Sequence, residues 1–241
     1  IITIHPEATE NLENSIKKIK QLNKKVGVSL NPETKIDLLI NLLSQIDPNN
    51  TLELKDITNE IIADTYFYDF SDNSRKILDN IILKSKNVSY RVWEDRDKSI
   101  PLSSIKEMFT LASIVEKETF LKREKSLISG VFYNRFEKNM RLQSDPTVVY
   151  AITNGKRKMD RKLLRRDLKI KSKYNTYVNK GLPPSPICFP GIDSLYATIN
   201  PSNSDYLYFV SNFKDGGHIF SSSYKQHLQN IKKVQKLRKK W

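Results

Sequence analysis

Cysteine and histidine are scarce in this sequence, and their scarcity limits the kinds of site that it can build. The 241 residues include 1 cysteine and 3 histidines. The single cysteine, Cys188, excludes an internal disulfide and any metal site made from a cysteine cluster. The histidines, His5, His218 and His227, are too few for a multi-histidine metal centre. We therefore expect neither a bound metal nor a cofactor.

Long apolar stretches are missing as well. No run approaches the roughly 18 apolar residues that a transmembrane helix requires, and the N-terminus does not have the pattern of a signal peptide. Because the chain begins at Ile1 without a methionine, we expect it to be part of a longer protein whose upstream segment has been removed. The remaining composition, 38% hydrophobic and 28% charged, is ordinary for a soluble globular protein.

Acidic residues are strongly outnumbered in one half of the chain. Residues 1–120 contain 16 basic and 19 acidic residues, whereas residues 121–241 contain 25 and 8, so the net charge of +14 belongs to the second half. Ten basic residues lie in Lys156–Lys173, where they face only Asp160 and Asp167. Such a cluster indicates either a solvated surface or a site for a polyanion such as nucleic acid, an anionic membrane or an acidic glycan.

The first 55 residues predict a small βααβ subdomain. Its helices are indicated by apolar residues at helical spacing, and the second follows a typical start signal, Asn31-Pro32. The predicted elements are a strand at Ile1–Ile4, helices over residues 12–22 and 36–46, and a strand at Thr51–Leu54. We expect a domain boundary at residue 55, with residues 56–241 forming the second domain.

Residues 56–241 predict a larger, helix-rich domain. Ser104 and Glu107 match the capping box that begins a helix. Two β-type runs near the C-terminus predict a hairpin, because a glycine pair precedes the second of them. The predicted elements are helices after Ser74, after Ser104, over Leu121–Asn139 and from Asp145-Pro146 with Asp145 as N-cap, strands at Tyr206–Val210 and His218–Ser221, and a helix over Tyr224–Trp241. The fold class is α+β.

A carboxylate falls on the apolar stripe of the helix that starts after Ser104. The stripe contains Ile105, Met108, Phe109 and Ala112, and its next position is Glu116. Burial raises the pKa of a carboxyl group and keeps it protonated, which is the state that a general acid needs. Alternatively, the helix ends there and Glu116 is exposed or pairs with a nearby arginine. Glu118 is two positions further, about 200° round the helix, and is expected to face elsewhere.

Other candidate residues have ordinary structural explanations. Glu124 continues the stripe of the next helix, but an acid is also favoured in a first helical turn by the helix dipole. Asp145 is explained as a helix N-cap. His218 lies beside a glycine pair, where a structural role and a ligand contact fit equally well.

Eight sequence blocks follow one another in the second domain. They are ASIVEKET (Ala112–Thr119), VFYNRF (Val131–Phe136), MRLQSDPTVVYAI (Met140–Ile152), YNTY (Tyr174–Tyr177), GLPP (Gly181–Pro184), PG (Pro190-Gly191), YLYFV (Tyr206–Val210) and GGHIFS (Gly216–Ser221). In this order they resemble the endolytic murein transglycosylases, the MltG or YceG-like family. The βααβ subdomain is similar to the LysM-like subdomain that precedes the catalytic part in this family.

The resemblance implies a lytic transglycosylase acting on bacterial peptidoglycan. Such an enzyme cleaves the β-1,4 bond from N-acetylmuramic acid to N-acetylglucosamine within glycan strands and leaves 1,6-anhydro-N-acetylmuramic acid ends. The resemblance also implies a single N-terminal membrane anchor, absent from this chain, with the catalytic domain on the extracytoplasmic side of the cytoplasmic membrane. Peptidoglycan synthases are the expected protein partners. The implied catalytic acid/base is the first glutamate of the EKET block, Glu116.

The same blocks contain the residues expected to bind the glycan. Hydrogen bonds to its acetamido and hydroxyl groups are expected from Gln143, Ser144, Asp145, Asn175, Thr176 and Tyr177, and stacking on sugar faces from Tyr174 and Tyr177. For each of these residues, bracing of a loop is the alternative role.

Three other functions remain open from the sequence. A two-carboxylate muramidase would use Glu116 with Glu124 or Asp145. A non-catalytic peptidoglycan-binding protein would use Glu116 as a structural residue. Nucleic-acid binding is suggested by charge alone, and since the sequence has no zinc-finger, RRM or helix-turn-helix pattern, we do not expect it.

Overall fold

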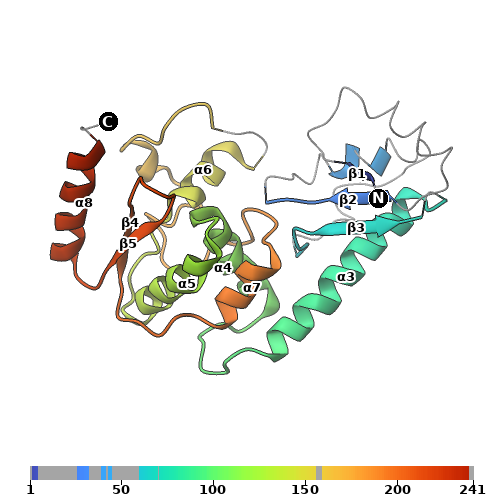
Figure 1. The fold of residues 1–241 in the computed structure, drawn as a ribbon, viewed down its shortest axis with the longest axis horizontal. Helices are drawn as coiled ribbons and strands as arrows, with labels where there is room; N and C mark the ends of the chain where they lie inside the picture. The colour runs from blue at the N-terminus through green and yellow to red at the C-terminus, as the bar shows by residue number, and fades with distance from the viewer. Residues whose placement is uncertain are drawn as a thin grey trace. The chain divides into compact units, whose positions relative to one another are not determined.

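A computed structural model describes residues 2–4, 26–32, 39–41, 43–44, 60–69, 71–155 and 159–238. The chain divides into two compact units, residues 1–91 with 188–192, and residues 92–187 with 193–241. Helices and strands occur in both units (Figure 1), so the predicted α+β class is confirmed. The predicted helix over 12–22, the predicted strand at Thr51–Leu54 and the boundary at residue 55 lie outside the described residues.

The first unit contains a three-stranded sheet in the order β1-β2-β3. β1 (Ile2–Ile4) pairs in parallel with β2 (Val26–Ser29), and β2 pairs antiparallel with β3 (Thr65–Tyr68). β1 was predicted, and described residues of the predicted second helix are helical at 39–41 and 43–44. β2 was not predicted, because four residues that include Gly27 give almost no alternating pattern.

The core of the first unit lies between this sheet and α3 (Ser74–Glu94). Ile77, Leu78 and Ile81 are buried at helical spacing, as the sequence predicted. The hydroxyl of Tyr66 donates to the Ile62 carbonyl at 2.8 Å and contacts Ser85 Oγ at 2.8 Å, so the polar end of this buried ring is satisfied.

The second unit is organised around α4 (Ile105–Glu118). Ser104 is its N-cap and accepts from the Glu107 backbone N–H, as predicted, while the Glu107 carboxylate accepts from both the N–H and the hydroxyl of Ser103. Every residue from Met108 to Val115 is buried, so the helix is enclosed on all sides along this stretch instead of on one stripe.

The remaining elements of the second unit appear in Figure 1, and all but the η2 turn and α7 were predicted from the sequence. They are α5 (Lys122–Glu137), α6 (Asp145–Thr153), a short 3₁₀ turn η2 (Asp167–Lys169), α7 (Ile192–Ile199), the antiparallel hairpin of β4 (Tyr208–Ser211) and β5 (His218–Ser221), and α8 (Tyr224–Arg238). α8 packs against both strands of the hairpin. None of the described helices combines the length and apolar character needed to cross a bilayer.

Close backbone approach explains a glycine in the middle of α5. A Cβ atom at Gly130 would lie 2.5 Å from the Ser202 carbonyl oxygen. The Asn134 amide, one turn later, donates to the carbonyls of Ser204 and Tyr206. α5 therefore holds the segment that leads into β4 directly against its own backbone.

Candidate active site

Glu116 lies in the last turn of α4 within an ion pair. Its Oε2 is 2.8 Å from the Nζ of Lys125 on α5, and both side chains are largely buried, with exposed fractions of 12% for Glu116 and 8% for Lys125. The fully buried Ser194 of α7 donates its hydroxyl to the same oxygen. The carboxylate of Glu116 thus joins α4, α5 and α7, and its partner is a lysine, where the sequence had suggested exposure or an arginine.

Glu118, the last residue of α4, is in a different environment. The hydroxyl of Ser144 donates to its Oε1 at 2.5 Å. Burial raises the pKa of the Glu118 carboxyl to about 7, and the negative charge of Asp145 raises it further, while the Ser144 hydrogen bond and the charge of Arg135 act in the opposite direction. Near neutral pH this carboxyl is therefore protonated in a large share of molecules, as a general acid must be.

Asp145 and Tyr177 are joined beside Glu118. The Tyr177 hydroxyl donates to Asp145 Oδ1 at 2.6 Å, and the Asp145 side chain is exposed in the first turn of α6. The prediction that Asp145 is the N-cap of this helix is wrong, because the N-cap is Ser144. Ser144 makes no capping hydrogen bond because its hydroxyl is directed to Glu118 instead.

Gln143 precedes this pair with an unusual backbone conformation. Its φ is 51°, in the left-handed region that a non-glycine residue seldom adopts, and its side chain is exposed. Its N–H donates to the Thr176 carbonyl at 3.1 Å, which fixes the turn against the Tyr174–Tyr177 loop. Strain of this kind tends to accumulate at functional sites.

Asn175 and Thr176 are buried inside the loop. The Asn175 amide donates to the Leu168 and Ile170 carbonyls, and its oxygen accepts from the Tyr177 N–H. The Thr176 hydroxyl accepts from the Ser144 N–H at 3.0 Å. These bonds give both residues the bracing role that was the alternative from the sequence, and their role in binding a glycan stays a prediction.

Tyr174 is held at its hydroxyl, and its ring packs at an angle of 49° against the ring of Tyr150. Its hydroxyl is 2.6 Å from Ser185 Oγ, and its ring lies 4.7 Å from that of Tyr150, centroid to centroid. The ring is half-buried. Its predicted stacking on a sugar is left open by these contacts.

Arg135 is a site residue that the sequence reasoning missed. The side chain is buried, and it donates to the carbonyls of Leu142 at 2.6 Å and Leu207 at 2.7 Å. Its guanidinium lies 5.3 Å from the ring centroid of Tyr208. It thereby ties α5 to the turn before Gln143 and to the start of β4, and its charge acts on Glu118. The sequence signal was a lone cation in the otherwise uncharged block VFYNRF.

Glu124 pairs with His218 on the β4–β5 hairpin. One Glu124 oxygen lies 2.8 Å from His218 Nδ1 and the other accepts the His218 backbone N–H. Glu124 is also in the first turn of α5, as the helix-dipole explanation requires. The contacts with His218 make Glu124 a link between α5 and the β4–β5 hairpin.

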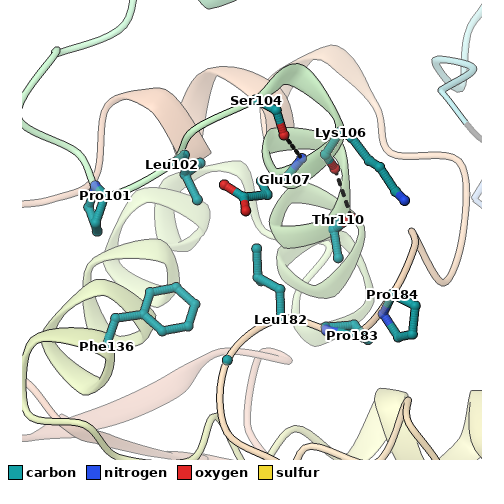
Figure 2. A pocket seen from close by; sticks show the side chains of 11 residues that line it. Pro101, Leu102, Ser104, Lys106, Glu107, Thr110, Phe136, Leu182, Pro183 and Pro184 are labelled. Carbon is teal, nitrogen blue, oxygen red and sulfur yellow. Dashed lines mark hydrogen bonds between the residues drawn. The ribbon is translucent and has the colours of Figure 1, made fainter.

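A pocket of about 480 Å³ lies at the other end of α4 (Figure 2). Its walls are the first turns of α4, Phe136 of α5 and the Gly181–Pro184 loop. It contains none of the predicted site residues. Within the described part of the chain, no group of three or more histidine, cysteine, aspartate or glutamate side chains is arranged to hold a metal.

The raised pKa of Glu118 predicts a pH-dependent stability. Between about pH 4.5 and pH 7 the folded chain keeps a proton that the unfolded chain has lost, so the free energy of unfolding falls as pH rises through this window and stays lower above it, by roughly 3 kcal/mol. Glu118→Gln removes the ionisation. We expect the variant to be more stable than the wild type at about pH 8 and nearly equal at about pH 4 in urea denaturation. A constant difference across this range would contradict the raised pKa.

Comparison with known proteins places the chain in a family. A family model described as the YceG-like family matches residues 5–233. The endolytic murein transglycosylase of Bacillus subtilis (strain 168) is 39% identical over 163 residues, which are 68% of this chain and 44% of that protein. The endolytic murein transglycosylase of Streptococcus pneumoniae (strain ATCC BAA-255 / R6) is 33% identical over 171 residues, 69% of this chain and 30% of that protein.

The chain therefore spans less than half the length of these two curated relatives. A crystal structure of a yceG-like protein from Listeria monocytogenes is similar in fold, with a TM-score of 0.63 and 27% sequence identity over 83% of this chain and 74% of that one. Since the family model extends over most of the residues, the chain belongs to the YceG-like family.

Proposed function

We propose that this chain cleaves peptidoglycan glycan strands as an endolytic lytic transglycosylase. The bond cut is the β-1,4 bond between N-acetylmuramic acid and N-acetylglucosamine, and the new end is 1,6-anhydro-N-acetylmuramic acid. Two relatives named endolytic murein transglycosylase support the reaction class. The observation that carries the proposal is a carboxyl group, Glu118, with its pKa raised to about 7 beside Ser144 and Asp145.

Glu118 has the properties of the general acid/base. In its protonated form it donates to the glycosidic oxygen as the C–O bond breaks and the sugar becomes oxocarbenium-like. The C6 hydroxyl of the same muramic acid then attacks the anomeric carbon, and the ionised Glu118 takes the proton of that hydroxyl. Because the nucleophile belongs to the substrate, no water has to be activated, and proximity contributes much of the rate.

Glu116 was the acid/base expected from the sequence, and its catalytic role remains a prediction. Its contacts favour another role. Its Oε2 is already engaged by Lys125 at 2.8 Å and by the Ser194 hydroxyl. In our proposal Glu116 therefore fixes the end of α4, two residues before Glu118.

The neighbours of Glu118 supply the rest of the proposed site. Ser144 orients the carboxyl through its hydroxyl, and Gln143 and Tyr174 offer polar and aromatic groups to the sugars. Asn175 and Thr176 hold the loop from which Tyr177 reaches Asp145. We propose that the residues of the Gln143–Asp145 turn and the Tyr174–Tyr177 loop contact the glycan together.

A two-carboxylate muramidase is the second candidate, and the position of Asp145 favours it. Asp145 is exposed and close enough to Glu118 to raise its pKa. In a hydrolase Asp145 would activate a water molecule or stabilise the sugar cation, in place of the internal C6 hydroxyl. Glu124 is less suited to that role, because both its oxygens are held by His218.

The masses of the products distinguish the two reactions. We expect mass spectrometry of fragments released from purified glycan strands to show 1,6-anhydro ends, which lack one water relative to reducing ends. Reduction with borohydride is a suitable control, since it adds hydrogen to reducing ends and leaves anhydro ends unchanged. If the fragments carried reducing ends alone, the chain would be a muramidase and not a transglycosylase. If no fragments were released, a non-catalytic peptidoglycan-binding protein would be the better interpretation.

The finer organisation of the longer protein is also proposed from the resemblance. Residues 1–55 would form a LysM-like subdomain and residues 56–241 the catalytic domain. The substrate lies outside the cytoplasm, so we propose that the chain acts on the extracytoplasmic side of the cytoplasmic membrane, attached by an N-terminal anchor. Peptidoglycan synthases, which make the strands, are the proposed protein partners.

A further inference from the structure

Besides Arg161, which pairs with Asp167, six described cationic side chains are exposed on the segment that connects α6 to the Tyr174–Tyr177 loop. Among the described residues, none of the six forms an ion pair with a carboxylate. We name this set the cationic platform, and its members are Lys162, Arg165, Arg166, Lys169, Lys171 and Lys173. Unpaired charge at this density attracts anions and is weakened by salt.

The backbone beneath the platform is held in one shape by Asp167. Arg161 donates two hydrogen bonds to the buried Asp167 carboxylate, at 2.6 and 3.0 Å, and the Leu164 N–H donates a third at 2.8 Å. The Arg161 hydrogen bond lowers the pKa of Asp167 to about 2. Asp167 is thus used to build the turn, and its two carboxylate oxygens are held by Arg161 and the Leu164 N–H, with no ion pair to a platform cation.

The platform is also attached to the candidate active site. The amide of Asn175 donates to the carbonyls of Leu168 and Ile170, inside the platform segment, at 3.1 and 2.9 Å. The η2 turn packs against α6, the helix that begins at Asp145. The residues that order the Tyr174–Tyr177 loop therefore also fix the platform, and the two surfaces are presented together.

We propose that the cationic platform binds carboxylates of the stem peptides on the same glycan strand whose sugars occupy the site of Glu118. This inference rests on the proposed function. Stem peptides carry several free carboxylates, and they project from the muramic acid residues next to the bond that is cut. A partner independent of the substrate would have no need of a surface braced to the catalytic loop. Each exposed ion pair is weak, so several must act together.

The test compares strands with and without stem peptides as substrates of the 241-residue chain. We expect kcat/KM to be higher for peptide-bearing strands, and this preference to shrink as salt is raised. In the triple variant Lys162→Gln, Lys169→Gln, Lys171→Gln, the ratio of kcat/KM on peptide-bearing strands to that on peptide-free strands should fall roughly tenfold. The control variant Lys225→Gln, Lys232→Gln, Lys233→Gln removes the same charge from exposed sites on α8 and should keep the wild-type ratio.

Several results would overturn the inference. One is a wild-type ratio in the platform variant, and another is an equal loss in the α8 control. A third is a platform variant that loses binding to phosphatidylglycerol vesicles or to duplex DNA while its substrate ratio is unchanged, which would assign the platform to a membrane or to nucleic acid. If the wild type cut neither kind of strand, the proposed function itself would fail, whereas equal cutting of both kinds at all salt concentrations would remove the platform proposal alone.

Discussion

Glu118→Gln is expected to lower kcat for glycan cleavage by about 10²–10⁴-fold or more. A glutamine keeps the size of the side chain and can still accept the Ser144 hydrogen bond, but its amide cannot donate a proton to the glycosidic oxygen. The rate is measured as soluble fragments released from purified strands at about pH 6, where the wild-type carboxyl is protonated, and is divided by the amount of folded protein.

The control for this variant is the same substitution at an exposed position. Glu137→Gln, at the end of α5, changes a carboxylate to an amide on the surface, and we expect it to cleave at the wild-type rate. If Glu118→Gln retained more than half of the wild-type rate, Glu118 would not be the acid, and the sequence-based assignment to Glu116 would become the better hypothesis.

Glu116→Gln is expected to lower the free energy of unfolding by about 3–5 kcal/mol. The substitution leaves the ammonium group of Lys125, whose side chain is 8% exposed, without its charged partner. Urea denaturation at about pH 7 measures the effect. Glu118→Gln should act in the opposite direction at this pH and above, because it removes a buried ionisable carboxyl. The two glutamines on one helix turn thus have opposite expected effects on stability.

A double variant separates the lost partner from a general intolerance of the position. Glu116→Leu with Lys125→Met removes both charges and keeps apolar side chains of similar size, so it should recover most of the lost stability. Activity per folded molecule in Glu116→Gln should stay within about tenfold of the wild type, since no proton is lost from the proposed acid. A stable but inactive Glu116→Gln would reverse the roles that we assign to the two glutamates.

The course of α4 was predictable, and so was the inward direction of Glu116. Ser104 caps the helix as expected, and the apolar stripe leads to a carboxylate that is buried. Periodicity could not reveal Lys125, since an ion pair between two helices depends on how they pack. It placed Glu118 away from the apolar stripe, and it could not show that Ser144, about 25 positions further along the chain, contacts Glu118 there. The apolar stripe therefore identified Glu116 as the inward-facing glutamate, whereas the raised pKa belongs to Glu118.

The Tyr174–Tyr177 loop shows that a sequence motif does not predict which of its side chains are buried. The motif marked four residues as a group, and the structure does bring Tyr177 to Asp145 and Thr176 to Ser144. It could not tell which side chains face inward. Asn175 and Thr176 are buried and hold the backbone, while Tyr174 and Tyr177 are half-buried. Inward and outward positions in an irregular loop follow from its hydrogen bonds, which have no period in the sequence.

The titration of the Glu118 carboxyl tests the central claim most directly. Infrared difference spectra between the wild type and Glu118→Gln isolate the protonated carboxyl band of this residue across a pH series. An apparent pKa of about 7 is expected, so that a large share of the Glu118 carboxyl groups can still donate a proton near neutral pH. A carboxyl that ionises at its ordinary value near 4.5 would contradict the assignment of Glu118 as the general acid.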